Sequence, residues 1–558
     1  MNAETHAERD TRGPLAEVAV VVIGYDDAAH VTDAVRSALA QGPAVREVIA
    51  VDDCSTDGSA GLLDRLAASE PRLKVIRRRV NSGGCGTPRN TGLDAVASPY
   101  VMFLDSDDVL PPGAVAALLE AASGARAEVA SGLCVRREVP SGREVPWQPR
   151  LYALHAVVPH PARRTRLVHD TLCVNKLYRT AFLRAHGIRF PEGRFPYEDV
   201  VFTARVLAAA PRIALIPDRV YVWHVRRSAE RLSISLDRAG VANWRARTEA
   251  CRQAYEVLLG AGQKELARAV RAKFLDHDLR MYLRELGLRD AAYRRAWWEL
   301  TRAHLAEYDA DDWARNPAAP GRLAGRVVLA CPEPRDLPRL RELAARPARL
   351  CPPYAHAADG TPVWSADLPQ VSLEPLLARP VGALPLAVDA ELRARGRDAR
   401  LRLRLRLHEL YGRVAQAGPE TVETQWRHRD DGDVVVRGAT LALTPYEPGA
   451  EAAGTGPESA GSWWAETTVD LAALAARGAG TWDLRLRIRF RDGASRDVTA
   501  HALTGTGLLR RGAVPSARHG VVLVQPYITH SGALALRVAP GVRGVLSVAR
   551  SRLRRLLH

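Results

Sequence analysis

The chain has 558 residues, of which 47% are hydrophobic and 25% are charged, an ordinary composition that excludes wholesale disorder. At roughly 150 residues per domain, this length predicts three or four domains. Basic residues outnumber acidic ones by 79 to 63, and the formal net charge of +16 favours an anionic partner such as a nucleic acid, an anionic membrane or an anionic polymer. Arginine supplies nearly all of this charge, which a GC-rich genome with a preference for arginine codons also produces.

The cysteines and the N-terminus exclude further classes of protein. The seven cysteines are scattered and form no CxxC pair, so the sequence supports neither a zinc ribbon nor a disulfide framework. Residues 1–12 carry both signs of charge and lack the basic-then-apolar pattern of a signal peptide. No apolar run approaches the roughly 20 residues that span a bilayer. We therefore expect a cytoplasmic protein with a flexible N-terminus at residues 1–15.

Apolar runs and helical patterns alternate through the first 110 residues. In chain order they lie at 18–23, 29–40, 47–51, 60–68, 73–76, 91–97 and 100–104. This β-α-β rhythm predicts an α/β fold with a mostly parallel sheet and crossover helices, in which ligands bind at the carboxyl ends of the strands. Acidic clusters fall at those ends, at 26–27, 52–57 and 105–108.

The rest of the chain changes its pattern twice. Residues 236–308 have a helical pattern, several prolines follow, and after about residue 370 the period becomes two. Segments 401–407 and 482–490 alternate apolar residues with arginines, as half-buried strands of an antiparallel β-sandwich require. The predicted domains are a Rossmann-like α/β domain at 16–235, a helical linker domain at 236–310, a Pro-rich connection at 311–370, a β-sandwich at 371–540 and a basic tail at 541–558.

A D-x-D triplet follows the apolar run at 100–104. Residues two apart in a strand point the same way, so Asp105 and Asp107 share a face and Asp108 faces oppositely. Two hard carboxylates at a strand end suit Mg²⁺ or Mn²⁺ carrying a diphosphate, and a solvated turn is the alternative. We expect Asp108 to matter less than the other two aspartates.

Two more polar loops follow predicted strands. Asp53 lies in a D-D-C-S-T-D-G-S loop, where a carboxylate can accept the imide N–H of uracil, and a turn with a helix N-cap is the alternative. Asn81 and Gly83 open a glycine-rich loop, and glycines allow close backbone approach to a ligand. Arg89 offers a two-pronged guanidinium to phosphate, and an ordinary loop-to-helix transition is the alternative.

Together these segments, over about residues 17–110, resemble the family 2 glycosyltransferases, which have the GT-A fold. The loops D-D-x-S-x-D-x-[ST], N-x-G-x-x-x-x-x-R-N and D-x-D occur in the order and spacing of that family, after a position where the family has an aromatic residue followed by asparagine and this chain has Tyr25-Asp26. Ile23 replaces the usual proline and Asp26 the usual asparagine, and neither change removes a group that the chemistry clearly needs. The resemblance implies a nucleotide-sugar site that includes Tyr25, Asp53, Asn81, Gly83, Arg89, Asp105 and Ser106.

A Glu-Asp pair further along the chain also resembles the family. In similar enzymes this pair opens a helix under the acceptor, which implies that Asp199 is the catalytic base and that Glu198 lies beside it. A carboxylate near a helix N-terminus stays ionised at neutral pH, as a base requires. The alternative is that both residues are ordinary first-turn acids.

The segment 221–235 resembles a strand and loop that close over the donor phosphates in this family. Arg227, Ser233 and Ser235 are therefore further candidates for the nucleotide-sugar site. His224 is a candidate third metal ligand beside Asp105 and Asp107, and a structural histidine in an aromatic strand is the alternative.

The C-terminal region is similar to a narrower group, the glycosyltransferases that decorate wall teichoic acid and carry immunoglobulin-like modules. The similarity rests on 86–90 and 525–534. The arginines of 402–406 and 485–489 either form a basic surface for a phosphate polymer or are solvated strand faces. The tail at 541–558 is either an amphipathic helix attracted to anionic lipid or a frayed terminus.

The sequence therefore predicts a metal-dependent, inverting glycosyltransferase that uses Mn²⁺ or Mg²⁺. It would move a hexosyl or N-acetylhexosaminyl group from a UDP-linked sugar to a hydroxyl of an anionic cell-envelope polymer, such as a teichoic-acid-like polyol phosphate. The expected partners are the nucleotide-sugar, the polymer, a second copy through the C-terminal region and the inner face of the cell membrane, but no nucleic acid. A nucleotidyltransferase and a non-catalytic polymer-binding scaffold are the alternatives.

Overall fold

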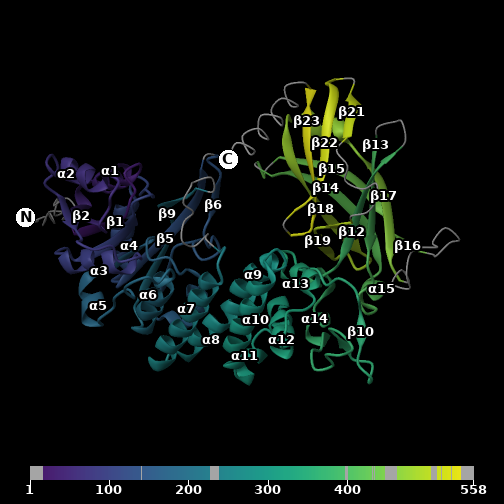
Figure 1. Ribbon diagram of the computed structural model, residues 1–558, viewed down its shortest axis with the longest axis horizontal. Helices are drawn as coiled ribbons and strands as arrows, with labels where there is room; N and C mark the ends of the chain where they lie inside the picture. Colours follow the sequence, from purple (N-terminus) through teal and green to yellow (C-terminus); the bar gives the residue numbers. More distant parts are fainter. Residues whose placement is uncertain are drawn as a thin grey trace, which may run out of the picture. The chain divides into compact units, whose positions relative to one another are not determined.

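The computed structural model describes residues 17–139, 141–226, 238–395, 400–429, 431–432, 434–446, 461–503, 512–516, 518–529 and 531–541. The chain divides into unit 1, Met1–Phe274, and unit 2, Leu275–His558 (Figure 1). The division falls inside the predicted helical linker, 236–310, so helices of that segment contribute to both units. No helix in the described ranges is both long and apolar enough to cross a membrane.

Unit 1 is built on one sheet. Its strands are β1 (Val18–Gly24), β2 (Val45–Asp52), β3 (Leu73–Arg77), β4 (Tyr100–Asp105), β5 (Val129–Val139), β6 (Glu144–Pro146), β7 (Ala156–Val158), β8 (Lys176–Arg179) and β9 (Ile213–Arg226). The order is β3-β2-β1-β4-β8-β5-β9-β7, and β6 pairs with β5. Strands β1 to β4 pair in parallel, β8 runs antiparallel between β4 and β5, and β9 runs parallel to β5. The predicted α/β fold with a mostly parallel sheet is confirmed.

Helices cover this sheet, and the burial of β1 shows that both of its faces are covered. All six residues from Val18 to Ile23 are buried, as expected for a central parallel strand. The helices of the sheet region are α1 (Val31–Leu39), α2 (Ser59–Ala67), α3 (Gly86–Ala95), α4 (Ala114–Ala125), α5 (Thr180–Ala185) and α6 (Glu198–Ala208). Two longer helices, α7 (Val241–Gly260) and α8 (Lys264–Lys273), complete unit 1, and α7 packs on α6.

Helix α3 begins earlier than the sequence pattern indicates. It starts at Gly86 rather than near residue 91, so the motif Gly86-Thr-Pro-Arg-Asn90 is its first turn and not a loop. Pro88 fits there because the first turn of a helix leaves its N–H groups without intrahelical acceptors. Gly92 lies where a Cβ would collide with Val21 of β1, so this glycine lets the helix approach the sheet closely. The consequence is that Arg89 is held on a rigid element.

Unit 2 begins with helices. They are α9 (Arg280–Leu286), α10 (Ala291–Ala306), α11 (Ala310–Ala314), α12 (Pro320–Ala330), α13 (Leu337–Ala344) and, after a short pairing of β10 (Ala355–His356) with β11 (Pro362–Val363), α14 (Glu374–Leu377). The segment 311–370, predicted to be a Pro-rich connection, therefore contains most of α11 and all of α12 and α13. Pro320 is the first residue of α12 and Pro338 lies in the first turn of α13, so these prolines start helices where the sequence pattern indicated a linker.

Two sheets follow the helices of unit 2. The first has the order β16-β17-β13-β12-β20, and the second has the order β15-β14-β18-β23-β22-β21 with β19 beside β18. Their bounds are β12 (Val388–Arg395), β13 (Arg400–Leu407), β14 (Pro419–His428), β15 (Val435–Ala442), β16 (Thr444–Pro445), β17 (Trp463–Val469), β18 (Gly480–Phe490), β19 (Ser495–Val498), β20 (His501–Ala502), β21 (Gly512–Ser516), β22 (Gly520–Ile528) and β23 (Leu534–Pro540). Pairing is antiparallel except between β12 and β20.

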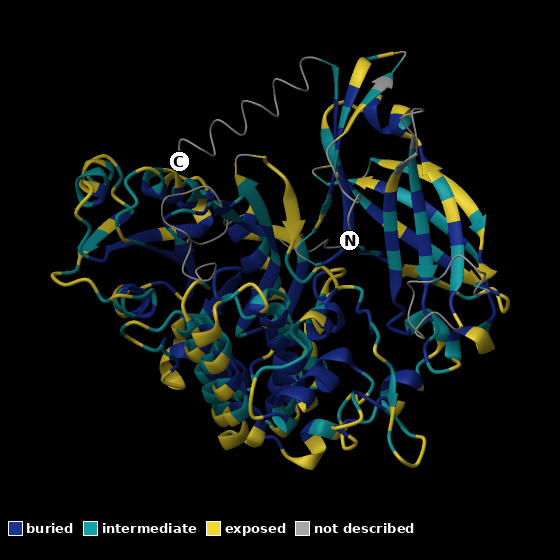
Figure 2. Ribbon diagram, turned by 45° about the vertical axis from the view of Figure 1, so that its right-hand side comes forward, coloured by how far each residue is buried: buried dark blue, intermediate teal, exposed yellow. Residues whose placement is uncertain are grey.

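The alternation that predicted these strands is present in the structure. On β13, Leu403, Leu405 and Leu407 are buried, and buried positions alternate with less buried ones along the strands of unit 2 (Figure 2). A fully buried arginine joins the helices to the strands. Arg349 pairs with Glu342 of α13 and donates hydrogen bonds to Thr499 and to the carbonyl of Ser531. The predicted helical and antiparallel parts of the fold class are thus both confirmed.

Candidate active site

The acidic clusters of the sequence meet at one edge of the sheet in unit 1. The register pairs Gly24 with Asp52 across β1 and β2, and Ile23 with Asp105 across β1 and β4. Because these strands are parallel, their carboxyl ends lie side by side, and the loops that follow them are neighbours. The residues predicted to form the ligand site therefore lie where the site was predicted, at the carboxyl ends of the strands.

Asp26 organises the first of these loops. Its backbone has a positive φ of 47°, and its Oδ1 accepts hydrogen bonds from the backbone N–H of Thr56 at 2.6 Å and from the hydroxyl of Thr56 at 3.2 Å. The backbone hydrogen bond from Thr56 lowers the pKa of Asp26 below its ordinary value. The aspartate that stands in the usual place of asparagine thus ties the loop after β1 to the loop after β2. Tyr25, beside it, is 38% exposed.

Asp53 is buried and already has several protein donors. Its Oδ2 accepts the Ser82 hydroxyl at 2.7 Å, the Ser82 N–H at 3.0 Å and the Asn81 side-chain amide at 3.2 Å. Its Oδ1 lies 2.7 Å from Nε of Arg78. Asp53 and Asn81 therefore hold the glycine-rich loop in place, and Gly83 allows its turn with a φ of 78°. Contact of these residues with a nucleobase stays a prediction.

Arg89 brings together three of the predicted site carboxylates. Its side chain is 2% exposed and projects from α3. Nη2 donates to Asp105 at 2.7 Å, and Nη1 donates to Glu198 at 2.6 Å and to Asp199 at 3.0 Å. We call Arg89, Asp105, Glu198 and Asp199 the carboxylate cluster. Both Nη atoms thus donate to carboxylates, whereas the sequence predicted that the guanidinium binds phosphate.

The two carboxylates that open α6 differ in environment. The Glu198 side chain is 9% exposed and the Asp199 side chain 23%. Burial, and then the charge of Asp199, raise the pKa of Glu198 to about 7. Oδ2 of Asp199 faces the backbone N–H of Cys173 at 3.4 Å. Asp199 is therefore the more accessible of the two, as a base that meets a substrate hydroxyl must be.

Asp107 and His224 lie on the solvent side of the D-x-D loop. The Asp107 side chain is 42% exposed and lies 3.2 Å from Nη1 of Arg226. Partial burial, and then the charge of Asp105, raise its pKa to about 6. Nδ1 of His224 lies 3.1 Å from the carbonyl oxygen of Asp107, and burial lowers the pKa of this histidine. His224 thus contacts the D-x-D loop through the backbone of Asp107, and its role as a third metal ligand beside the two carboxylates stays a prediction.

The chemistry of this donor set fits a hard divalent cation that is shared with a diphosphate. Mg²⁺ commonly takes one or two protein carboxylates and completes its shell with phosphate oxygens and water. Asp105 and Asp107 supply two such groups, and their mutual repulsion is of the kind that a cation relieves. No cluster of three or more His, Cys, Asp or Glu side chains with metal-binding geometry occurs in the described parts of the chain.

Asp108 has a stronger structural position than the sequence indicated. It is buried, and it accepts hydrogen bonds from the Tyr221 hydroxyl at 2.7 Å and from the His224 N–H at 2.7 Å. The same Tyr221 oxygen accepts the Asp105 N–H at 3.2 Å. Asp108 thus fixes the D-x-D loop to β9, and its smaller part in metal-dependent turnover stays a prediction. Sequence spacing gave no sign of Tyr221, which pairs with a residue more than a hundred positions away.

Ser106 connects the D-x-D loop to the loop after β1. Its hydroxyl donates to Asp27 at 2.7 Å, and Asp27 in turn lies 2.5 Å from Nδ1 of His30. Gly24 lies where a Cβ would come within 2.9 Å of Ser106, so only glycine fits there without displacement. The predicted residues Arg227, Ser233 and Ser235 lie outside the described residues.

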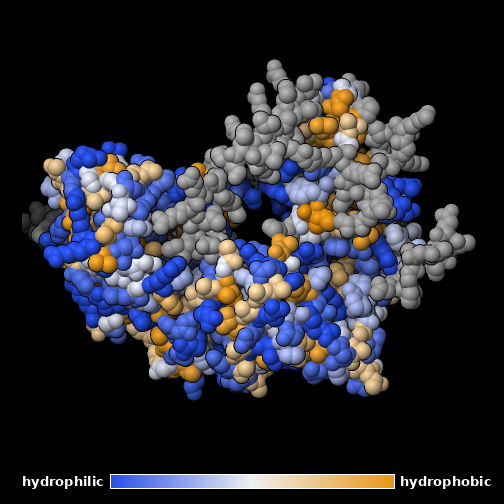
Figure 3. All heavy atoms as spheres, in the orientation of Figure 1, coloured by the Kyte–Doolittle hydropathy of each residue, from blue (hydrophilic) through white to orange (hydrophobic). Residues whose placement is uncertain are grey.

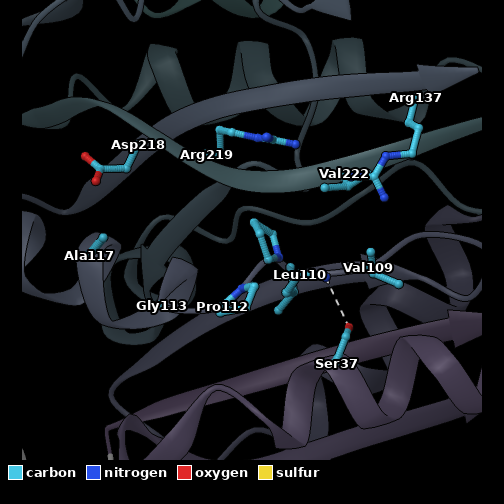
Figure 4. A pocket seen from close by; sticks show the side chains of 11 residues that line it. Ser37, Val109, Leu110, Pro112, Gly113, Ala117, Arg137, Asp218, Arg219 and Val222 are labelled. Atoms are coloured by element: carbon cyan, nitrogen blue, oxygen red, sulfur yellow. Dashed lines mark hydrogen bonds between the residues drawn. The ribbon is translucent and has the colours of Figure 1, made fainter. Parts of the chain in front are cut away.

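A groove of about 650 Å³ lies beside this site and is lined by none of the predicted site residues. Figure 4 shows it between Val109 and Val222, with the hydroxyl of Ser37 accepting the N–H of Leu110 at 3.1 Å. Its polar wall includes Arg137, whose guanidinium is paired with Glu144 at 2.7 Å. The groove is therefore an adjacent surface, and the chemistry-bearing residues lie at the strand ends.

Part of unit 1 matches a known protein family. Residues 19–187 match the model for glycosyl transferase family 2. Residues 19–187 are therefore similar to family 2 glycosyltransferases, and the resemblance drawn from the motifs in this region is confirmed.

Two known proteins are similar in sequence to parts of this chain. The chain is 30% identical over 221 residues to the poly(ribitol-phosphate) β-N-acetylglucosaminyltransferase TarS of Staphylococcus aureus, covering 39% of this chain and 37% of TarS. It is 30% identical over 232 residues to the succinoglycan biosynthesis protein ExoO of Rhizobium meliloti, covering 40% of this chain and 65% of ExoO. The TarS match thus spans well under half of that relative's length.

A solved structure has a similar fold over most of the length of this chain. The crystal structure of S. aureus TarS aligns over 94% of this chain and 85% of its own with a TM-score of 0.51 at 18% sequence identity. At this identity the match shows a common fold and no more.

Proposed function

We propose that the protein is an inverting glycosyltransferase that moves a sugar from a UDP-linked donor to a hydroxyl of an anionic cell-envelope polymer of the polyol phosphate kind. The observation that carries the proposal is the convergence of Asp105, Glu198 and Asp199 on Arg89 within a family 2 domain. The acceptor class is supported by the likeness to TarS, a poly(ribitol-phosphate) β-N-acetylglucosaminyltransferase.

Asp199 is the proposed general base. An inverting transfer needs one base beside the acceptor hydroxyl, and the base must be ionised while remaining accessible. Arg89 donates a hydrogen bond to Oδ1 of Asp199, and the Cys173 N–H faces Oδ2. The carboxylate is nevertheless 23% exposed, so an acceptor can reach it. Glu198, more deeply buried on the same guanidinium, keeps Arg89 in position.

Asp105 and Asp107, with His224 as the third candidate, are the proposed ligands of Mn²⁺ or Mg²⁺. The cation would supply positive charge against the leaving diphosphate. The chain's own part is to hold these ligands in place: Tyr221 and Asp108 fix the Asp105 backbone, and Arg226 pairs with Asp107. Tyr25 and the Asp53 loop are the proposed contacts of the nucleoside.

The test is a donor screen with the full chain. UDP-, GDP- and ADP-linked sugars are offered with Mn²⁺, with Mg²⁺ and with chelator, and nucleoside diphosphate release is measured with and without poly(ribitol phosphate). We expect release from a UDP-sugar, dependent on the metal and increased by the polymer. No release from any nucleotide-sugar would favour the alternative of a non-catalytic scaffold. Release of pyrophosphate from a nucleoside triphosphate would favour a nucleotidyltransferase.

Three further proposals concern assembly and location. The C-terminal region is proposed to form a homo-oligomer, which light scattering tests. The basic tail is proposed to touch the anionic inner face of the membrane, which vesicle sedimentation tests, and its residues 542–558 lie outside the described ranges. Figure 3 shows hydrophilic residues mixed with scattered hydrophobic ones on the described part of the protein face in view.

A further inference from the structure

The second sheet of unit 2 presents arginines along its outer face. On β18, Leu484, Leu486 and Ile488 are buried, so the alternate residues point away from the core. The register of β14, β15, β23 and β22 brings further side chains onto this outer side. We call this set the arginine face; its members are Arg427, Arg429, Arg437, Arg485, Arg487, Arg489, Arg537 and Tyr527.

Acidic side chains neutralise only part of the arginine face. Arg487 lies 2.7 Å from Asp497, and Arg429 lies 2.5 Å from Asp483. Glu423 is a third acid in register, opposite Arg487. Seven arginines thus face three such acids, and the exposed Arg485 and Arg489 have no ion pair within the described part of the chain.

The face also carries an aromatic ring between two guanidinium groups. The guanidinium carbons of Arg429 and Arg537 lie 5.3 Å and 5.5 Å from the centre of the Tyr527 ring. Tyr527 is half-buried, its hydroxyl is buried, and Ala535 opposite it on β23 is fully buried, so the ring is only partly exposed. A planar guanidinium binds phosphate through two hydrogen bonds, and an aromatic ring contacts the C–H groups of a polyol or sugar. This arrangement suits a chain in which polyol units alternate with phosphates.

The other arginine strand of unit 2 is different and serves as an internal comparison. On β13, Arg402 and Arg404 both pair with Glu466 of β17, the latter at 2.9 Å. Arg406 lies over the Trp464 ring at 5.7 Å. The arginines of β13 are therefore largely paired within their own sheet. The same alternating sequence pattern leaves unpaired positive charge on the sheet that contains β18 and little on the sheet that contains β13.

We propose that the arginine face binds phosphate groups of the anionic acceptor polymer at positions away from the residue being glycosylated. This inference rests on the proposed function, since it assumes that polymer as the acceptor. Along β18 the arginines recur every second residue, about 6.8 Å apart, so several phosphates of one chain are contacted together. Contacts of this kind raise the association rate and affinity for a polyanion and weaken with salt.

The test compares two double variants of the full chain. Arg485→Gln with Arg489→Gln removes unpaired arginines of the face, and Arg402→Gln with Arg404→Gln removes arginines paired with Glu466. We expect the first variant to raise the Kd for poly(ribitol phosphate) about 3- to 10-fold, because exposed charge contacts contribute modestly, and to flatten its salt dependence. We expect the second variant to bind as wild type does.

Two assays that do not depend on polymer binding distinguish a failure of this inference from a failure of the proposed function. They are hydrolysis of the donor and glycosylation of an acceptor that has a single unit. Both double variants should release UDP from the donor, and glycosylate ribitol phosphate monomer, at the wild-type rate. Equal polymer affinity for the first variant and wild type overturns the arginine face, even when glycosyl transfer is intact. An altered oligomeric state in light scattering overturns it in favour of a subunit contact. Equal affinity of the wild type for a DNA oligonucleotide of the same charge overturns its assignment to a polyol phosphate.

Discussion

The carboxylate cluster of unit 1 and the arginine face of unit 2 use the same residue type in opposite ways. Arg89 is 2% exposed and is surrounded by three carboxylates, whereas Arg485 and Arg489 are exposed on an open sheet. The net charge of +16 therefore says little about where free positive charge lies. The role of each arginine depends on the number of acidic side chains around it. Arg89 has three carboxylates around it and holds the geometry of a site. An arginine with few acidic neighbours keeps a positive charge that is available to a partner.

The largest expected effect concerns the metal ligands next to the carboxylate cluster. Asp107→Ala should abolish metal-dependent turnover of the donor, because it removes the more exposed of the two proposed carboxylate ligands. The fold should persist, since that side chain is 42% exposed and has an arginine partner at the surface. Diphosphate release with Mn²⁺ and with chelator measures this.

Asp108 supplies the control for that variant. Asp108→Ala should lower the melting temperature, because it leaves the Tyr221 hydroxyl and the His224 N–H without their acceptor in a buried place. Full turnover by Asp107→Ala in chelator would remove the proposed metal role of the D-x-D pair.

A pair of arginine substitutions tests the comparison through stability. Arg89→Met should destabilise the protein by about 3–5 kcal/mol, because it leaves buried carboxylates without their counter-charge. Arg485→Gln, on the exposed face, should change the free energy of unfolding by less than about 0.5 kcal/mol. Urea denaturation followed by tryptophan fluorescence measures both. Equal destabilisation by the two variants would mean that the exposed arginine has a structural role that its surroundings do not reveal.

The pH dependence of stability tests the buried position of Glu198. Its pKa is about 7 in the folded protein and has an ordinary value of 4.5. A raised folded pKa contributes stability that is complete below about pH 4.5 and is lost as the pH rises to about 7. The stability of wild type relative to Glu198→Gln should therefore fall across that window.

Thermal unfolding at pH 4.5 and at pH 7.5 gives the difference for Glu198→Gln. Glu120→Gln, at an exposed position of α4, is the control for loss of a carboxylate. A constant difference between wild type and Glu198→Gln over this range would contradict the assigned burial of the charge.

The smallest expected effect is that of ionic strength, which should act differently on the two regions. Release of UDP from the donor in the absence of polymer should change little between 50 and 300 mM salt, because the ion pairs of the carboxylate cluster centre on the buried Arg89 and are weakly screened. Polymer binding should weaken across the same range. A parallel salt dependence of both quantities would indicate that the polymer is held by the active site alone.

Much of the fold follows from the sequence, and the exceptions have a physical cause. The strands β1 to β4 could be predicted because central parallel strands are near-continuous apolar runs. The strands β13 and β18 could be predicted because one of their faces is buried. Helix α3 was placed too late, and α12 and α13 were missed, because glycine and proline indicate a loop unless a proline lies in the first turn of a helix.

The candidate site could be predicted as a set of residues but not as a network. Spacing identified Asp105, Glu198 and Asp199, and parallel strands put the first of these at the expected edge. It could not show that Arg89 binds all three, since the bond to Glu198 joins residues 109 positions apart. For the same reason the sequence did not show that Tyr221 and Arg226, which lie in the segment 221–235, hold the D-x-D loop.

The central claim is that the carboxylate cluster performs glycosyl transfer with Asp199 as the base. The most direct measurement pairs calorimetry of UDP-sugar binding with a transfer assay on wild type and Asp199→Asn. Removal of a general base slows the chemistry about 10²- to 10⁴-fold and leaves the donor site intact. The account therefore predicts an almost unchanged donor Kd with a transfer rate reduced by that factor. Transfer at the wild-type rate, or loss of donor binding with the variant still folded, would contradict it.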